Sequence, residues 1–236
     1  MLKSYVAFDL ETTGLSPENH EIIEIGALKV REGKVVDRFI EFVRPEKKIP
    51  PMITELTGIS EDMVKEAGDC QDVLPDFLKF CEKDTLIGHN VQFDFSFVKT
   101  KAQELGYKYE HLGIDTLKIA KVVHADLPSR KLGDLCEYYH IKNAAAHRAY
   151  HDALATAKLY QSMAHFHEEL LPKIFVPKPL QYKVKKKEPV TAKQIAFLSR
   201  LMEQKNITIE KDIHSMTKSE ASRTIDLILS GNEKLH

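Results

Sequence analysis

The sequence YVAFDLETTG at residues 5–14 is the strongest indication of how this chain folds. An apolar run that ends in a Thr-Thr-Gly turn is typical of a core strand. Asp9 and Glu11 stand two positions apart in it. Because successive side chains of a strand point to opposite faces, both carboxylates are expected on one face, with Leu10 on the other. Paired acids repel each other and are costly to desolvate, so a compensating cation is expected, although a strand end whose acids reach solvent also fits the pattern.

The segments that follow predict a layered α/β or α+β fold. Residues 22–30 and 35–43 form a strand pair around a Glu32-Gly33 turn, and residues 85–89 form another buried strand. Apolar spacing predicts helices around residues 60–67 and 73–81, and over residues 93–105, 117–124, 132–139 and 149–171. Strands first, then strand and helices mixed, indicate a sheet covered by helices.

The composition changes near residue 173. Residues 173–190 are rich in proline and lysine, which predicts a linker. Beyond it, residues 191–205 and 217–229 have helical periodicity, with Thr191 as an N-cap and Gly231 just past the second helix. The sequence therefore predicts a main domain over residues 1–172, a linker over 173–190 and a small helical module over 191–236.

The balance of basic and acidic residues also changes near residue 173. The total of 34 basic and 35 acidic residues gives no hint of a polyanionic partner. From Lys173 to the end, however, there are 13 basic and 7 acidic residues, which leaves 21 basic and 28 acidic residues in the body. An acidic body with a basic tail is the feature that a function must explain.

Several protein classes are excluded by composition. With 43% apolar and 29% charged residues, the chain is an ordinary globular one. Three cysteines without a CxxC pair argue against a disulfide framework or a cysteine zinc site. The N-terminus does not read as a signal peptide, and no apolar stretch approaches the length of a membrane span. We therefore expect a soluble, cytoplasmic protein without a membrane partner.

Two further acids stand where ligand sites form. Asp94 lies directly after the 85–89 strand, at the start of a helix, where it is either a first-turn acid or a ligand-site carboxylate. Asp152 follows His147 by five residues, which would place them about 140° apart on one helix. They converge only if His147 belongs to the preceding loop. A zinc site at His147 and His151 is a weaker alternative, because the glutamate of HExxH and a third soft ligand are lacking.

Together, Asp9, Glu11, Asp94 and Asp152 form a set of hard oxygen ligands. Such ligands suit Mg²⁺ or Mn²⁺, and four of them can hold two ions roughly 3.5–4 Å apart for an in-line phosphoryl displacement. A neighbouring histidine can accept the proton of the attacking water. The residues alone therefore favour phosphodiester hydrolysis.

At this point a family resemblance becomes plain. The strings FDLETTG (8–14), HNVQFD (89–94) and HRAYHDA (147–153), in this order and with these gaps, resemble the three motifs of DEDDh 3′→5′ exonucleases. The likeness is greatest to the epsilon-type proofreading exonuclease of bacterial DNA polymerase III. IIEIGALKV, ITELTGIS and IDTLKIA match as well, so the resemblance covers roughly residues 3–165. It implies a ribonuclease-H-like α/β fold with a mixed five-stranded sheet flanked by helices.

The resemblance also implies a role for each residue that matches a motif. Asp9 would bridge two metal ions, Glu11 and Asp152 would help to hold the catalytic ion, and Asp94 would bind the second ion largely through water. His147 would be the general base. Its place five residues before Asp152 matches the histidine subclass, whereas the tyrosine subclass has its residue four before.

The resemblance further implies contacts to the terminal nucleotide. Thr12, Leu15 and Phe93 match substrate-binding positions, with Leu15 as an apolar wedge against a base. Core packing is the alternative for Leu15 and Phe93. Asp115 is expected to be structural.

The tail offers one more candidate for substrate binding. A run of lysines is either a set of phosphate contacts or a solvated linker: Lys183, Lys185, Lys186 and Lys187. The sequence predicts a two-metal 3′→5′ exonuclease that releases nucleoside 5′-monophosphates from the 3′ ends of DNA. Single-stranded DNA is the expected substrate. The enzyme is expected to act in proofreading or repair, beside a DNA polymerase or another replication or repair partner. RNA 3′-end trimming and a non-catalytic nucleic-acid-binding module are the alternatives.

Overall fold

The computed structural model describes residues 1–143, 145–185, 188–209 and 211–230. These fall into two compact units, Met1–Val184 and Lys185–His236. The first unit carries every residue of the predicted catalytic set. The second unit is described separately below.

A mixed sheet with strand order β3-β2-β1-β4-β5-β6 forms the centre of the first unit. Strands β1 (Tyr5–Thr12), β2 (Ile22–Arg31) and β3 (Lys34–Phe42) are antiparallel neighbours. Strands β4 (Leu86–Gly88) and β5 (Leu112–Asp115) run parallel to β1. The ends of β1 and β4 therefore meet at one edge of the sheet, where Asp9, Glu11 and the start of the following helix gather.

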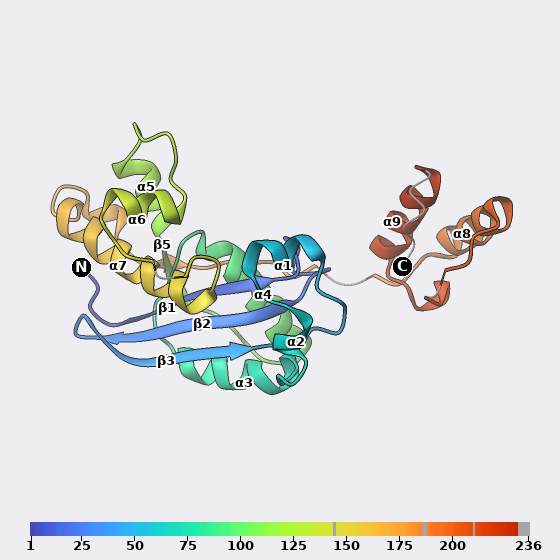
Figure 1. Cartoon of the computed structure of the whole chain (residues 1–236), viewed down its shortest axis with the longest axis horizontal. Helices are drawn as coiled ribbons and strands as arrows, with labels where there is room; N and C mark the ends of the chain where they lie inside the picture. Colours follow the sequence, from blue (N-terminus) through green and yellow to red (C-terminus); the bar gives the residue numbers. More distant parts are fainter. Residues whose placement is uncertain (144, 186–187, 210, 231–236) are drawn as a thin grey trace. The chain divides into compact units, whose positions relative to one another are not determined.

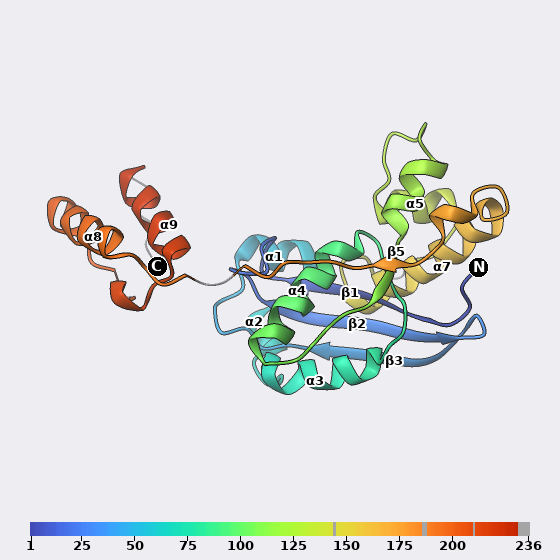
Figure 2. The ribbon, with the colours of Figure 1, turned by 180° about the vertical axis from the view of Figure 1, so that it is seen from behind.

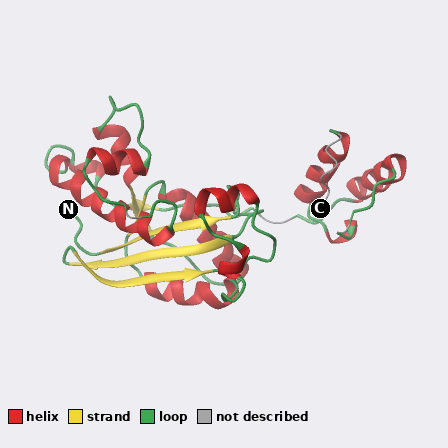
Figure 3. Cartoon of the chain, viewed as in Figure 1, coloured by secondary structure: helices red, strands yellow, loops and turns green. Residues whose placement is uncertain are grey.

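Helices cover both faces of this sheet (Figures 1 and 3). The helices of the first unit are α1 (Pro51–Thr57), α2 (Glu61–Val64), α3 (Cys70–Cys81), α4 (Val91–Glu104), α5 (Thr116–Val123), α6 (Leu132–Tyr138) and α7 (Ala149–His167), with a 3₁₀ turn, η1, at Pro172–Ile174. The α/β class with a mixed sheet and flanking helices, predicted from the sequence, is confirmed.

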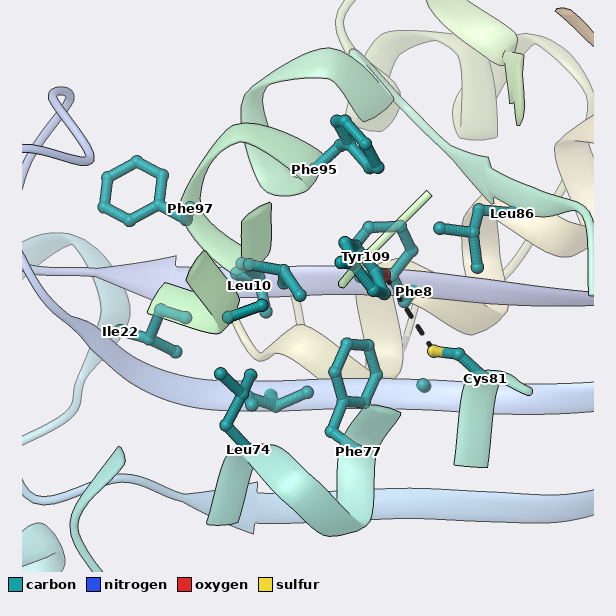
Figure 4. Close-up of a cluster of buried hydrophobic side chains, with 14 of the residues drawn as sticks. Phe8, Leu10, Ile22, Leu74, Phe77, Cys81, Leu86, Phe95, Phe97 and Tyr109 are labelled. Atoms are coloured by element: carbon teal, nitrogen blue, oxygen red, sulfur yellow. Dashed lines mark hydrogen bonds between the residues drawn. The ribbon is translucent and has the colours of Figure 1, made fainter. Parts of the chain in front are cut away.

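Side-chain alternation along β1 divides the core between the two faces. Phe8 and Leu10 belong to a cluster with residues of α3 and α4 (Figure 4), whereas Tyr5 and Ala7 belong to a second cluster with residues of α5 and α7. Phe8 and Phe77 of α3 lie with their ring centroids 5.8 Å apart. Burial of this kind, at about 25 cal/mol per Å² of apolar surface, fixes the register of β1 and with it the direction of its two acids.

The predicted boundary at residue 172 differs from the structure. Phe175 is buried against the second cluster, and β6 (Lys178–Pro179) pairs with β5, so the sheet has six strands rather than five. The first twelve residues of the predicted linker therefore belong to the main unit. Proline is a strand breaker in the interior of a sheet but is tolerated on an edge strand, which is where Pro179 lies.

The second unit contains the two predicted helices, α8 (Ala192–Lys205) and α9 (Lys218–Leu229), and a 3₁₀ turn, η2, at Ile213–Ser215. Each helix begins with a capping box, from Thr191 to Gln194 and from Thr217 to Glu220. They enclose a small apolar cluster of Leu198, Leu201, Met216, Ala221 and Ile228. Within the described ranges, no helix is long and apolar enough to span a bilayer.

Candidate active site

Three carboxylates converge at the end of β1. Asp9 and Glu11 lie on the same face of that strand, and Asp152 lies in the first turn of α7. One ligand oxygen from each residue lies within 4.8 Å of the others. Asp9 and Glu11 thus share one face of β1, as the alternation of side chains predicts, and in the structure this is the face where α7 begins.

Asp152 is oriented by the loop that precedes α7. The Asn143 side-chain amide donates to Asp152 Oδ1 at 2.6 Å, and the backbone N–H of His147 donates to Oδ2 at 2.9 Å. His147 lies outside the helix, in the left-handed region with φ of 62°. This backbone conformation is uncommon for a residue other than glycine and is found most often at functional sites. His147 thus lies in the loop before the helix, which is the position it needs in order to converge with Asp152.

Asp94 approaches the same cluster from the other side of β1. It lies in the first turn of α4, is 3% exposed, and accepts a hydrogen bond at Oδ1 from the backbone N–H of Leu10 at 3.2 Å. Since Leu10 follows Asp9 directly, this bond fixes the position of Asp94 relative to the strand. Among the neighbouring charges, that of Asp94 raises the pKa of Asp9 the most.

The electrostatics of the cluster call for a cation. Burial raises the pKa of Asp9 well above its usual range, and the charges of Asp94, Glu11 and Asp152 raise it further. Burial also raises the pKa of Glu11 to about 8, with Asp152 adding to the increase and Arg148 opposing it. Carboxylates in this state are stabilised in their ionised form by a bound positive charge.

The donor set fits a divalent metal ion. It consists of carboxylate oxygens, the ligands that hard cations prefer, and no cysteine belongs to it. Asp9, Glu11 and Asp152 are the residues that can share one ion. The sequence-based expectation of a divalent metal cofactor is thus supported at the level of a carboxylate cluster.

An ion pair between a buried glutamate and a partly exposed arginine, close to the cluster, was not foreseen from the sequence. Glu24 of β2 is 1% exposed and accepts hydrogen bonds from Arg148, at 2.8 Å from Nη2 and 3.1 Å from Nε. A second oxygen of Glu24 accepts from the backbone N–H of Ala149 at 3.0 Å. The pair connects the beginning of α7 to β2, and its two residues are 124 positions apart in the sequence. A local sequence pattern therefore could not have predicted the pair.

Gly26 is a second residue that the sequence did not single out. It pairs with Asp9 in the sheet, and a Cβ atom there would lie 2.0 Å from the backbone nitrogen of Tyr150 and 2.2 Å from the carbonyl carbon of Ala149. Only glycine allows the first turn of α7 to lie this close to β2. This close approach brings Asp152 to the acids of β1.

The predicted nucleotide contacts surround the same edge of the sheet. Leu15 is 84% exposed, so the core-packing alternative is wrong for this residue. Phe93 is partly buried against the core and pairs with Phe97, with ring centroids 5.0 Å apart, so packing is one of its roles. Thr12 is buried, and its hydroxyl donates to the carbonyl of Gly14. Their contact with a nucleotide stays a prediction.

Two other polar residues of the motifs are structural. The carboxylate of Asp115 accepts hydrogen bonds from the backbone N–H groups of Asn90 and Leu117, which caps α5 and supports the start of α4. The ring nitrogens of His89 lie 2.9 Å from the Thr116 hydroxyl and from the Arg130 carbonyl. Asp115 therefore has the structural role expected of it.

The predicted lysine run spans the boundary between the two units. Lys183 is exposed and lines a groove of about 1060 Å³ beside β5 and β6, whereas Lys185 is the first residue of the second unit. Lys186 and Lys187 lie outside the described residues. Phosphate binding by these lysines stays a prediction.

The fold and this constellation define a class. The model of a family described as Exonuclease, of the RNase T type, matches residues 6–160, and the chain belongs to that exonuclease family. The resemblance carried by the three sequence motifs is thereby confirmed.

Individual proteins similar to the chain include DNA polymerases III of the PolC type. The chain is 47% identical over 159 residues to the PolC-type DNA polymerase III of Caldanaerobacter subterraneus, and 37% identical over 163 residues to that of Bacillus subtilis. These matches cover 67% and 68% of this chain and 11% of each polymerase. The chain thus corresponds to about a tenth of the length of these curated relatives.

Solved structures share the fold. Escherichia coli exonuclease I, in a complex with single-stranded DNA, superposes with a TM-score of 0.63 at 20% identity, covering 74% of this chain and 42% of that one. The nuclease domain of 3′hExo, a DEDDh family member bound to rAMP, gives 0.60 at 24% identity and covers 70% of this chain and 93% of that one.

Proposed function

We propose that this protein is a two-metal-ion 3′→5′ exonuclease that removes nucleoside 5′-monophosphates from the 3′ ends of DNA. The observation that carries the proposal is the meeting of Asp9, Glu11 and Asp152 within 4.8 Å, with His147 held just before α7 by its own bond to Asp152. An oxygen-rich cation site, with a histidine adjoining one of its ligands through the backbone, supports phosphodiester hydrolysis.

In this proposal each residue has a distinct task. Asp9, Glu11 and Asp152 hold one divalent ion and Asp94 contributes to a second; Mg²⁺ or Mn²⁺ would supply Lewis-acid stabilisation of the developing charge on the phosphate. The exposed imidazole of His147 accepts the proton of the attacking water. Asn143 and the Glu24–Arg148 pair keep Asp152 and the start of α7 in place.

Substrate binding is assigned to the loop after β1. Leu15 presents an exposed apolar side chain that can pack against the terminal base, with Thr12 and Phe93 at the border of that position. An apolar wedge recognises a frayed or single-stranded end better than a stacked one, because an unpaired base can lie against it. Single-stranded DNA is therefore the substrate we favour.

Likeness to PolC-type DNA polymerase III supports a role beside a DNA polymerase, in proofreading in trans or in repair. Such a role implies a cytoplasmic location. The domain division proposed here is an exonuclease unit that extends through Val184, followed by a helical unit.

The test compares 3′-labelled and 5′-labelled DNA and RNA oligonucleotides in the presence of Mg²⁺ or Mn²⁺. Stepwise shortening of 5′-labelled DNA, with release of labelled mononucleotide from 3′-labelled DNA, is the expected result. Asp9→Ala should abolish the shortening and His147→Ala should slow it by roughly a hundredfold or more. His165→Ala, at an exposed histidine near the end of α7, should leave it unchanged. Faster shortening of RNA than of DNA would reassign the substrate, and equal activity in the Asp9 and His147 variants would refute the proposed site.

A further inference from the structure

The segment that follows η1 is anchored to the exonuclease unit. We call residues 178–183 the strap. It begins as β6 beside β5, continues with a bond from the Leu180 N–H to the His111 carbonyl at 2.9 Å, and passes α4, where the Gln92 side chain donates to the Gln181 carbonyl at 3.0 Å. Figure 2 shows this orange segment running from β5 across α4.

Apolar contacts seat the strap on the core. Leu180 and Tyr182 pack against the cluster between the sheet and helices α3 and α4. Gly113 of β5 leaves the room that Leu180 uses, because a Cβ atom at this position would lie 2.6 Å from Leu180 Cδ1. The strap is therefore part of the folded unit, and it is held in place by β5 and by the apolar cluster.

The loop that carries Leu15 has its own hydrogen-bond frame. The backbone N–H groups of Asn19 and His20 donate to the carbonyl of Ser16 at 3.0 and 2.9 Å, and His20 Nδ1 accepts from the Ser16 N–H at 3.1 Å. Gly14 lies against the His20 ring, where a Cβ atom would be 2.3 Å from Cδ2. Leu15 is thus an exposed side chain on an ordered turn.

One carboxylate joins the strap to this loop. The Tyr182 hydroxyl donates to Glu18 Oε1 at 2.7 Å, and the Ser16 hydroxyl donates to Glu18 Oε2 at 2.8 Å. Burial, together with the hydrogen bond to Glu18, raises the pKa of Tyr182 to about 12, so its hydroxyl remains a proton donor at any working pH. Residues 164 positions apart are connected in this way at the border of the proposed nucleotide site.

We propose that Tyr182 is a positioning residue that holds the Leu15-bearing loop, through Glu18, in the conformation that receives the terminal nucleotide. The inference rests on the proposed function of that loop. The strap lies after residue 160, where the match to the exonuclease family ends. The inference therefore assigns a role to a segment outside the matched residues. Loss of the tether should loosen the loop and weaken substrate capture while the metal cluster remains intact.

Tyr182→Phe keeps the packed ring and removes only the hydroxyl. We expect KM for a single-stranded DNA end to rise roughly three- to tenfold, the range that the loss of one ordinary intramolecular hydrogen bond supports, with kcat within about twofold of the parent. Glu18→Ala should do the same, and the double variant should be no worse than either single one. Glu18→Gln, which keeps an acceptor for the tyrosine, should restore most of the affinity. Tyr107→Phe, on a half-exposed tyrosine, is the control.

Hydrogen exchange provides a readout that does not depend on activity. In Tyr182→Phe the amides of Asn19 and His20 should exchange faster, whereas the Leu180 amide, bonded to His111, should stay protected. Unchanged exchange at Asn19 and His20 together with an unchanged KM would overturn the tether. If the unmodified protein trims no DNA or RNA end, the proposed function fails, and the exchange data still decide whether Tyr182 orders the loop.

Discussion

Among single residues, His147 has the role that kinetics can isolate most cleanly. Its backbone N–H holds Asp152, and this bond survives replacement of the side chain. His147→Ala should therefore lower kcat by about 10²–10⁴, the usual contribution of a general base, with little change in KM. Steady-state trimming of a labelled oligonucleotide measures both parameters. A large rise in KM with kcat preserved would show that His147 binds substrate instead.

The protonation of Glu11 leads to a prediction about pH and metal. Its pKa is raised from 4.5 to about 8 in the folded protein, so between these values the folded state binds more protons than the unfolded state. Stability of the metal-free protein should therefore fall as pH rises through this window. In EDTA we expect the Tm of the unmodified protein to drop by on the order of 5 °C from pH 5 to pH 8. The drop should be smaller in an Asp9→Asn variant, because one repelling charge has been removed.

Added Mg²⁺ should reverse this loss. Because the ion binds the ionised carboxylates, the gain in Tm on adding Mg²⁺ should be larger at pH 8 than at pH 5. Thermal denaturation at the two pH values, with and without the metal, measures the effect. A gain that is equal at both pH values would contradict the link between the raised pKa values and the metal site.

At the scale of secondary-structure elements, the active site depends on how closely α7 approaches β2. A Cβ atom at Gly26 would overlap the backbone of Ala149 and Tyr150, which cannot move without shifting Asp152. Gly26→Ala should destabilise the protein by about 1–3 kcal/mol and reduce activity more than stability alone explains. Gly133→Ala is the matched control, because nothing lies within 4 Å of a Cβ atom there and α6 should gain from alanine.

Denaturant unfolding and initial rates below the melting range separate the two effects of Gly26→Ala. Full activity of the folded variant would mean that Asp152 reaches the cluster without the close approach.

Much of the site at this scale could be predicted from sequence. The alternation of β1 was enough to place Asp9 and Glu11 on one face. The five-residue spacing showed that His147 and Asp152 can converge only if His147 lies in a loop. The Glu24–Arg148 pair could not be found in this way, because its members are brought together only when α7 packs on β2. The strap could not be found either, because its proline and lysines are equally typical of a linker and its pairing with β5 is a tertiary contact.

At the scale of the whole molecule, the boundary of the exonuclease unit can be tested by truncation. A chain of residues 1–184 keeps Phe175, β6 and the strap, whereas a chain of residues 1–172 loses all three. Removing the buried Phe175 alone should cost about 1.5–3 kcal/mol. We expect the longer chain to unfold cooperatively with the Tm of the same transition in the full protein, and the shorter chain to be markedly less stable. Equal stability of the two chains would show that residues 173–184 do not stabilise the exonuclease unit and belong to the linker.

The same truncation tests the basic tail. If the lysines after Val184 contact phosphates, the 1–184 chain should bind single-stranded DNA more weakly than the full chain, and the dependence of log K on log salt should be less steep by about 0.7 per lost contact. Identical affinity and slope would show that the tail does not contact the substrate.

The central claim is that Asp9, Glu11, Asp94 and Asp152 hold the metal ions that cleave the phosphodiester bond. Titration of the protein with Mn²⁺, followed by the paramagnetic signal of the free ion, tests it most directly. The account predicts two bound ions for the unmodified protein in the presence of a nucleoside monophosphate, and loss of binding in Asp9→Asn alongside loss of hydrolysis. Mn²⁺ binding that is unchanged in Asp9→Asn would contradict it.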